Sequence, residues 1–120
     1  MKIAITSNGK TLDSELDPRF GRAQYFLIVD TETMALEVVE NTQNLNLPKG
    51  AGIQAGKTVA DQGVEAVITG NCGPKAFSTL NSANIKVITG IGGKVKEAVE
   101  KFKSGNLQHA GGPNVDGHWV

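Results

Sequence analysis

Apolar residues in this chain gather in short runs separated by turn-forming residues, and the first three runs read as strands. Lys2 to Ser7 is the first run. Gln24 to Asp30, with five consecutive apolar residues from Tyr25 to Val29, predicts a second strand that is covered on both faces. Ala35 to Glu40 alternates and predicts a third strand, joined to the second as a hairpin. The chain therefore opens as an antiparallel meander.

Helical and strand patterns alternate in the second half of the chain. A helix is expected at about Ile53 to Gln62, with Ile53, Gly56 and Ala60 on its inner face. The later elements, in order, are a strand at Glu65 to Thr69, a helix at Lys75 to Ala83, a strand at Ile85 to Thr89 and a helix at Lys94 to Lys103. Two strands joined by a crossover helix require parallel pairing. The pattern predicts an α/β fold with a mixed five-stranded sheet flanked by three helices.

Length, charge and apolar content limit the classes of protein to which the chain can belong. At 120 residues, it is expected to form one domain. Twelve basic and twelve acidic residues cancel, and no run of Lys or Arg marks a nucleic-acid or membrane surface. The longest apolar stretch is too short to span a bilayer, so we expect a cytoplasmic protein. With a single cysteine, Cys72, no internal disulfide can form, which agrees with a reducing compartment.

The tetrapeptide Val-Ile-Thr-Gly occurs twice, at 67–70 and 87–90, and each copy leads into a glycine-rich loop. The first loop is Gly70-Asn71-Cys72-Gly73-Pro74, and the second is Gly90-Ile91-Gly92-Gly93. A helical pattern follows each loop. Because the start of a helix presents free N–H groups and the positive end of the helix dipole, these loops favour an anionic ligand.

Three further segments carry a family resemblance. They are Leu16-Asp17-Pro18-Arg19-Phe20-Gly21-Arg22-Ala23 with the following Tyr25-Phe26, the Cys72 loop, and Ser104-Gly105-Asn106-Leu107. Together they resemble the dinitrogenase iron-molybdenum cofactor biosynthesis family, the NifX-like small proteins. The resemblance covers residues 1–107, which we take as the domain. Residues 108–120, rich in glycine, are expected to be a flexible C-terminal tail.

The resemblance implies a ribonuclease H-like fold, in which the first strand is central. The hairpin would lie on one side of it and the two Val-Ile-Thr-Gly strands on the other. The family also implies a role, without catalytic turnover, in binding a metal-sulfur cluster and passing it to cofactor-assembly proteins. The cluster would be an iron-sulfur, iron-molybdenum or molybdenum-copper sulfide.

With that strand order, the turns after three strands would open at one edge of the sheet, the usual ligand crevice of open α/β sheets. Arg19 and Arg22 would reach into this crevice and, with backbone N–H groups, hold an anionic cluster. Arg19 stands where relatives often carry a metal-binding His. The predicted cluster-binding residues are Ser7, Asn8, Arg19, Phe20, Gly21, Arg22, Gly70, Asn71, Cys72, Gly73, Gly90, Gly92 and Gly93. The glycines would let the cluster approach the main chain, or they would only make tight turns.

Three side chains are candidate metal ligands. Cys72 would be a single thiolate ligand if the helix start and nearby Arg lower its pKa, or else a small, inert core residue. His109 and His118 lie in the glycine-rich tail without a carboxylate pattern beside them, which is more typical of solvent-exposed histidines. Arg22 would either contact the ligand or pair with Asp17 to stiffen the loop.

The sequence argues against two other functions, nucleotide hydrolysis and nuclease activity. Residues 51–58 nearly spell a phosphate-binding loop, but no strand is predicted before them and Gly56-Lys57-Thr58 falls inside a helix. A metal-dependent nuclease needs acidic residues on the central strands, and the first strand has none. A phosphate-binding or small-molecule-binding regulatory module and a protein-interaction adaptor stay open as alternatives. The chain is expected to be a monomer or a weak homodimer that pairs through the exposed third strand.

Overall fold

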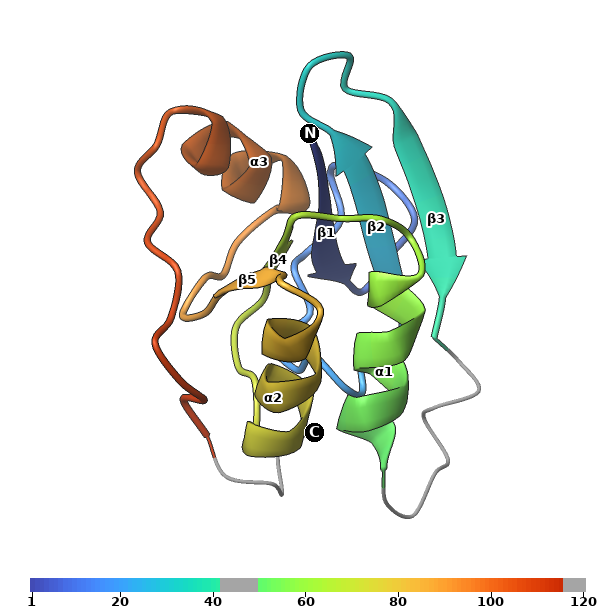
Figure 1. Ribbon diagram of the computed structural model, residues 1–120. Helices are drawn as coiled ribbons and strands as arrows, with labels where there is room; N and C mark the ends of the chain where they lie inside the picture. The colour runs from blue at the N-terminus through green and yellow to red at the C-terminus, as the bar shows by residue number, and fades with distance from the viewer. Residues whose placement is uncertain (42–49, 116–120) are drawn as a thin grey trace.

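The computed structural model describes residues 1–41 and 50–115 and is built around a five-stranded mixed sheet (Figure 1). The strands are β1 (Lys2–Ser7), β2 (Tyr25–Asp30), β3 (Leu36–Glu40), β4 (Ala66–Ile68) and β5 (Lys86–Ile88). Their order across the sheet is β3-β2-β1-β4-β5. This places β1 at the centre, with the hairpin on one side and the two repeated strands on the other, as the resemblance implies. The ribonuclease H-like label itself stays a prediction.

Strand directions set where the sheet can offer a site. β1 runs antiparallel to β2, with Ile3 opposite Val29, and parallel to β4, with Ile3 beside Ala66. β4 in turn runs parallel to β5. Because β1, β4 and β5 point the same way, the turns that follow them leave the same edge of the sheet.

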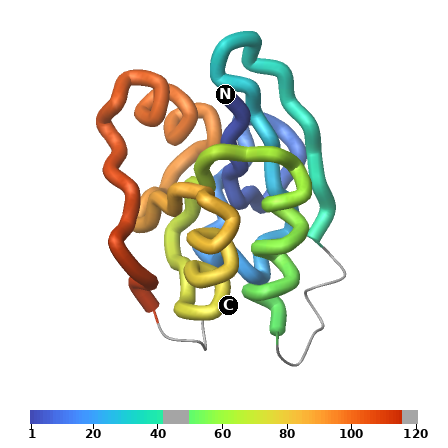
Figure 2. The backbone as a smooth tube through the Cα atoms, in the orientation of Figure 1, coloured from blue at the N-terminus to red at the C-terminus, as the bar shows by residue number. Residues whose placement is uncertain are grey.

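Helices cover both faces of the sheet (Figures 1 and 2). Helices α1 (Ala51–Ala60) and α2 (Pro74–Ser82) pack on one face, and α3 (Val95–Lys103) packs on the other. Successive strand residues face opposite layers: Ala4 and Val67 contact the α1 and α2 layer, and Ile3 and Ile68 contact the α3 layer. The sheet is therefore buried between two apolar layers, as the continuous apolar run of β2 predicts.

Helix α1 differs from its predicted position. It begins at Ala51 rather than at Ile53, and Ile53 and Ala60 are only partly buried. The buried residues are Ala51, Gly52, Ala55, Gly56 and Val59. The reason is that α1 packs against α2 as well as against the sheet: a Cβ at Gly56 would lie 2.7 Å from Cγ2 of Thr79. Because Gly56, Lys57 and Thr58 all lie within this helix, they cannot form a phosphate-binding loop.

Within residues 1–41 and 50–115, every helix is too short or too polar to cross a bilayer.

Candidate functional site

The segment between β1 and β2 crosses the edge of the sheet at which β1, β4 and β5 end. Main-chain hydrogen bonds attach it to the turn after each of these strands. The Asn8 N–H donates to the Glu15 carbonyl oxygen (3.0 Å). The Leu16 N–H donates to the Gly93 carbonyl oxygen (2.8 Å), and the Phe20 N–H donates to the Asn71 carbonyl oxygen (3.1 Å). The three turns therefore lie together, joined by residues 15–20.

Several buried side chains lie between these turns, and an open crevice among them stays a prediction. Thr6 lies at the centre, where its hydroxyl donates to the Asp17 carbonyl oxygen (2.7 Å) and lies 2.9 Å from the hydroxyl of Thr69. Leu16 packs in the α3 layer and is 5% exposed, and Phe20 packs in the α1 and α2 layer and is 0% exposed. The predicted site residues that are buried in this packing are Ser7, Phe20, Gly21, Gly70, Cys72 and Gly73. We call these six buried residues the support of this edge.

The other predicted site residues reach the surface and form what we call the exposed rim. Its members are Asn8, Arg19, Arg22, Asn71, Gly90, Gly92 and Gly93, of which Arg22 and Asn71 are partly buried. Arg19 and Asn71 face each other in a parallel bridge, and the Asn71 amide donates to the Pro18 carbonyl oxygen (3.1 Å). Two polar side chains from distant parts of the sequence are thus held side by side at the surface.

The buried Asp17 carboxylate holds the main chain of the loop that carries Arg19. It is 3% exposed, and its Oδ1 accepts a hydrogen bond from the Arg19 main-chain N–H (3.0 Å). Pairing of this carboxylate with Arg22, the alternative to contact between Arg22 and a ligand, stays a prediction. The bond to the main chain restricts the backbone at Arg19 and leaves the guanidinium at the surface.

The glycines at this edge of the sheet are required for different structural reasons. A Cβ at Gly70 would lie 2.9 Å from Cα and from the carbonyl oxygen of Pro18, so close packing of two loops requires that glycine. Gly90 and Gly93 have φ angles of 78° and 83°, which L side chains rarely adopt. Gly92 has an ordinary φ and nothing within 4 Å of its Cβ position. Packing thus explains Gly70, and turn geometry explains Gly90 and Gly93. Neither explains Gly92, where the main chain is exposed.

The start of α3 is not available to an anion, contrary to our expectation. The Val95 and Lys96 N–H groups donate to the carbonyl oxygens of Ser14 and Leu12 (both 2.9 Å). The Glu97 carboxylate accepts from the Lys94 N–H (2.9 Å), so the N–H of the N-cap residue is satisfied as well. These acceptors satisfy N–H groups that would otherwise attract a ligand.

Cys72 is a core residue, and its expected pKa shift was wrong. The thiol is 1% exposed and packs in the layer beneath α1 and α2. Burial raises the pKa of Cys72 to about 12, because the low-dielectric surroundings disfavour the charged thiolate. The neutral thiol is a poor metal ligand.

Asn114 contacts the Cys72 loop and was not among the predicted site residues. Its Oδ1 accepts from the Cys72 N–H (2.8 Å), and its side-chain amide donates to the Gly70 carbonyl oxygen (3.2 Å). Its own N–H donates to the Cys72 carbonyl oxygen (3.2 Å). Nothing in the local sequence marks this residue, since Gly-Gly-Pro-Asn is ordinary turn composition. Residues 108–115, expected to be a flexible tail, therefore include a specific contact with the domain.

The histidines do not complete a metal site in the described part of the chain. His109 lies beside β5, where it lines two cavities. His118 lies outside the described residues. Among residues 1–41 and 50–115, no three His, Cys, Asp or Glu side chains are grouped closely enough to hold a metal ion.

Comparison with known proteins gives consistent matches. The family model described as dinitrogenase iron-molybdenum cofactor matches residues 1–105. The apo form of the orange protein from Desulfovibrio gigas is 45% identical, with a TM-score of 0.93 over 95% of this chain and 96% of that chain. The NMR structure of a Thermotoga protein of the DUF35 family is 42% identical, with a TM-score of 0.78 over 90% and 91%. An uncharacterised protein of Methanocaldococcus jannaschii is 33% identical over 111 residues, 90% of each chain.

Proposed function

The chain belongs to the dinitrogenase iron-molybdenum cofactor family, and from this premise we propose that it carries an anionic metal-sulfur cluster on the exposed rim. The protein would hold the cluster as cargo and pass it to cofactor-assembly proteins without transforming it. Iron-sulfur, iron-molybdenum and molybdenum-copper sulfides all suit such a surface, because each presents negatively charged sulfides.

The bridge between Arg19 and Asn71 carries this proposal. It joins the main chains of an arginine and an asparagine of the exposed rim, and Asp17 and Phe20 hold these main chains through hydrogen bonds to the Arg19 N–H and the Asn71 carbonyl oxygen. A guanidinium offers several N–H donors in one plane, so it can bind two sulfides of a cluster at once. The fixed main chain at Arg19 limits the region that its guanidinium can reach, which reduces the conformational freedom lost when the cargo binds.

Gly92 supports the same location. Its main chain is exposed, and neither its φ angle nor internal packing requires a glycine there. A cluster several atoms wide must approach the main chain where no β-carbon blocks it if its sulfides are to accept hydrogen bonds from backbone N–H groups. With Cys72 buried and protonated, the protein would hold the cluster through charge and hydrogen bonds, with metal coordination left to the cluster's own sulfides.

The proposal is tested by anaerobic loading of the purified protein. One sample receives ferrous iron with sulfide and another receives tetrathiomolybdate with copper(I), and metal retained after gel filtration is measured with the visible spectrum. We expect Arg19→Ala to retain roughly fivefold less metal than the unmodified protein, because a charge-assisted contact is lost. Retention should also fall as salt rises, since exposed charges are screened.

Two variants serve as controls. Lys57→Ala removes an exposed positive charge on α1, away from the rim, and should load normally. Cys72→Ala should load within about twofold of the unmodified protein, because its thiol does not reach the cluster. If Arg19→Ala loads as much metal as the unmodified protein, or if Cys72→Ala loses the cluster, the proposal that the exposed rim holds the cluster without Cys72 is wrong.

A further inference from the structure

Strand β3 forms one edge of the sheet, and its main chain is paired on one side only. The Asn41 N–H donates to the Gln24 carbonyl oxygen, and the Asp30 N–H donates to the Ala35 carbonyl oxygen (both 3.0 Å). Because hydrogen-bonded and non-hydrogen-bonded pairs alternate along an antiparallel ladder, every second residue of β3 directs its N–H and carbonyl groups away from β2. These outward-facing residues are Leu36, Val38 and Glu40. Within residues 1–41 and 50–115, no hydrogen bond engages their outward groups.

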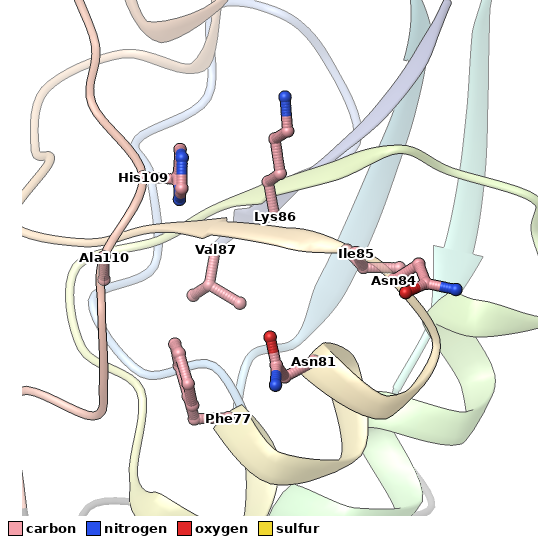
Figure 3. A pocket seen from close by; sticks show the side chains of 8 residues that line it. All are labelled: Phe77, Asn81, Asn84, Ile85, Lys86, Val87, His109 and Ala110. Carbon is pink, nitrogen blue, oxygen red and sulfur yellow. The ribbon is translucent and has the colours of Figure 1, made fainter.

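The opposite edge of the sheet, β5, is covered by the chain that follows α3. The Ala110 N–H donates to the Val87 carbonyl oxygen (2.6 Å), which faces away from β4. Figure 3 shows the segment that carries His109 and Ala110 passing next to β5. In the described part of the chain, β3 is therefore the edge that stays open to another strand.

Val38 lies at the middle of this open edge and is 40% exposed. Among the described residues, only Met1 joins it as an exposed large apolar side chain. Exposed edge strands are commonly protected by lysine, proline or a bulge, because a bare edge pairs with other chains. The centre of β3 carries valine instead, and the regular register with β2 continues through it. The strand is thus suited to pairing.

We propose that β3 pairs with β3 of a second copy of this chain, antiparallel and around a two-fold axis at Val38. Val38 would then lie opposite Val38 of the second copy, and Leu36 opposite Glu40. In this register every outward N–H group of β3 meets an outward carbonyl oxygen of the second copy. The two exposed valines would bury each other on the face of the sheet that carries α3.

Charge and strand length select this axis. An axis at Glu37 or Glu40 would set two carboxylates directly opposite each other, which is destabilising. An axis at Leu36 or Val39 would leave part of β3 without a partner from the other β3. With the axis at Val38, each glutamate lies opposite an apolar residue.

The contact would leave both exposed rims accessible. β3 is antiparallel to β2, and β2 is antiparallel to β1, so β3 runs in the direction of β1. Antiparallel pairing of two β3 strands therefore places the rims of the two copies at opposite ends of the joined sheet. A single strand pair is smaller than a standard protein interface of about 1,600 Å², so we expect weak self-association, with a Kd on the order of 0.1–1 mM.

Disulfide trapping tests the register on the metal-free protein, with Cys72→Ala as the background. Diamide oxidises two thiols to one disulfide and is itself reduced. Directly opposite residues of a hydrogen-bonded pair have Cα atoms about 5.5 Å apart, which a disulfide can span. Val38→Cys should form the linked dimer at least about fivefold faster than Glu40→Cys, an exposed position on the same strand that would not face its own copy.

Sedimentation equilibrium from about 20 µM to 1 mM measures the association itself. Val38→Lys sets two like charges opposite each other and should weaken association about tenfold or more. Ser78→Lys adds the same charge at an exposed position of α2 and should not. The ¹⁵N spectrum of each variant reports whether the fold is kept.

Three results would each overturn the proposal. They are a protein that stays monomeric at about 1 mM, Val38→Lys that associates as strongly as the unmodified protein, and Glu40→Cys that links as fast as Val38→Cys. Because no metal is present, the outcome is independent of whether the exposed rim carries a cluster.

Discussion

At the scale of single residues, burial decides which chemical groups are available. Cys72 has the most reactive side chain in the sequence, yet its position beneath α1 and α2 keeps the thiol neutral. Arg19 lies between the buried residues Asp17 and Phe20, and Asp17 holds only its main chain, so the arginine side chain stays exposed. Cys72 is thus a structural residue, and Arg19 is the better candidate for binding.

The buried thiol makes stability depend on alkaline pH. The pKa of Cys72 is raised from an ordinary 9.0 to about 12, so between these values the folded state keeps a proton that the unfolded state has lost. Its contribution is therefore complete below about pH 9 and declines as pH rises toward 12, with a slope of up to about 1.4 kcal/mol per pH unit. Urea unfolding at several alkaline pH values measures this slope. Cys72→Ala should show a smaller one, and identical slopes in both proteins would refute the assignment.

At the scale of elements, the site edge is built by two loops packed against each other. The turn after β4 and the loop before β2 touch at Gly70 and Pro18, where there is no room for a β-carbon. The same loop satisfies the N–H groups at the start of α3 through Leu12 and Ser14. One irregular segment therefore packs against the turn after β4 and caps a helix, and both contacts hold the exposed rim in place.

Gly70→Ala should loosen this loop contact. A methyl group 2.9 Å from the Pro18 backbone forces the two loops apart, and overpacking of this kind costs about 1–3 kcal/mol of unfolding free energy. Gly92→Ala is the matched control, because the added methyl meets nothing within 4 Å and φ is ordinary. Urea denaturation compares the three proteins. Equal stability of Gly70→Ala and the unmodified protein would mean that the loops yield without cost.

At the scale of the whole molecule, the segment after α3 returns along β5, an edge strand of the sheet. Ala110 bonds to β5 and Asn114 bonds to the Cys72 loop, which lies 42 positions earlier in the sequence. Residues between 105 and 110 also line one of the cavities beside β5. The C-terminal segment therefore contacts both the buried Cys72 loop and the edge strand β5.

Asn114→Ala should release the Cys72 loop. The variant leaves the Cys72 N–H without its acceptor at 2.8 Å, and an unsatisfied donor of this kind costs about 1–2 kcal/mol. Hydrogen exchange at the Cys72 amide should accelerate, and urea unfolding should shift to lower concentration. Gln108→Ala, an exposed position on the same segment, should change neither measurement. Unchanged exchange at Cys72 in Asn114→Ala would show that the contact does not hold the loop.

Local pattern was sufficient for the elements of the fold. Strand and helix periodicity located every helix and strand in the described residues to within a few positions, because alternation and i, i+3, i+4 spacing are properties of neighbouring residues. The inner face of α1 was misjudged because a second helix, α2, shares its burial, and no local pattern reports a neighbour that comes twenty residues later. Asn114 was missed for the same reason.

The sequence by itself determined the elements, their class of fold and, through the Phe-Gly-Arg-Ala loop and its companions, the family. Only the tertiary structure decided which residues of the expected site are accessible. That decision depends on contacts such as Leu16 with Gly93 and Phe20 with Asn71, which join segments far apart in the chain. Burial and pKa are collective results of such contacts, so Cys72 became a core residue and Arg19 a surface donor only when the loops packed.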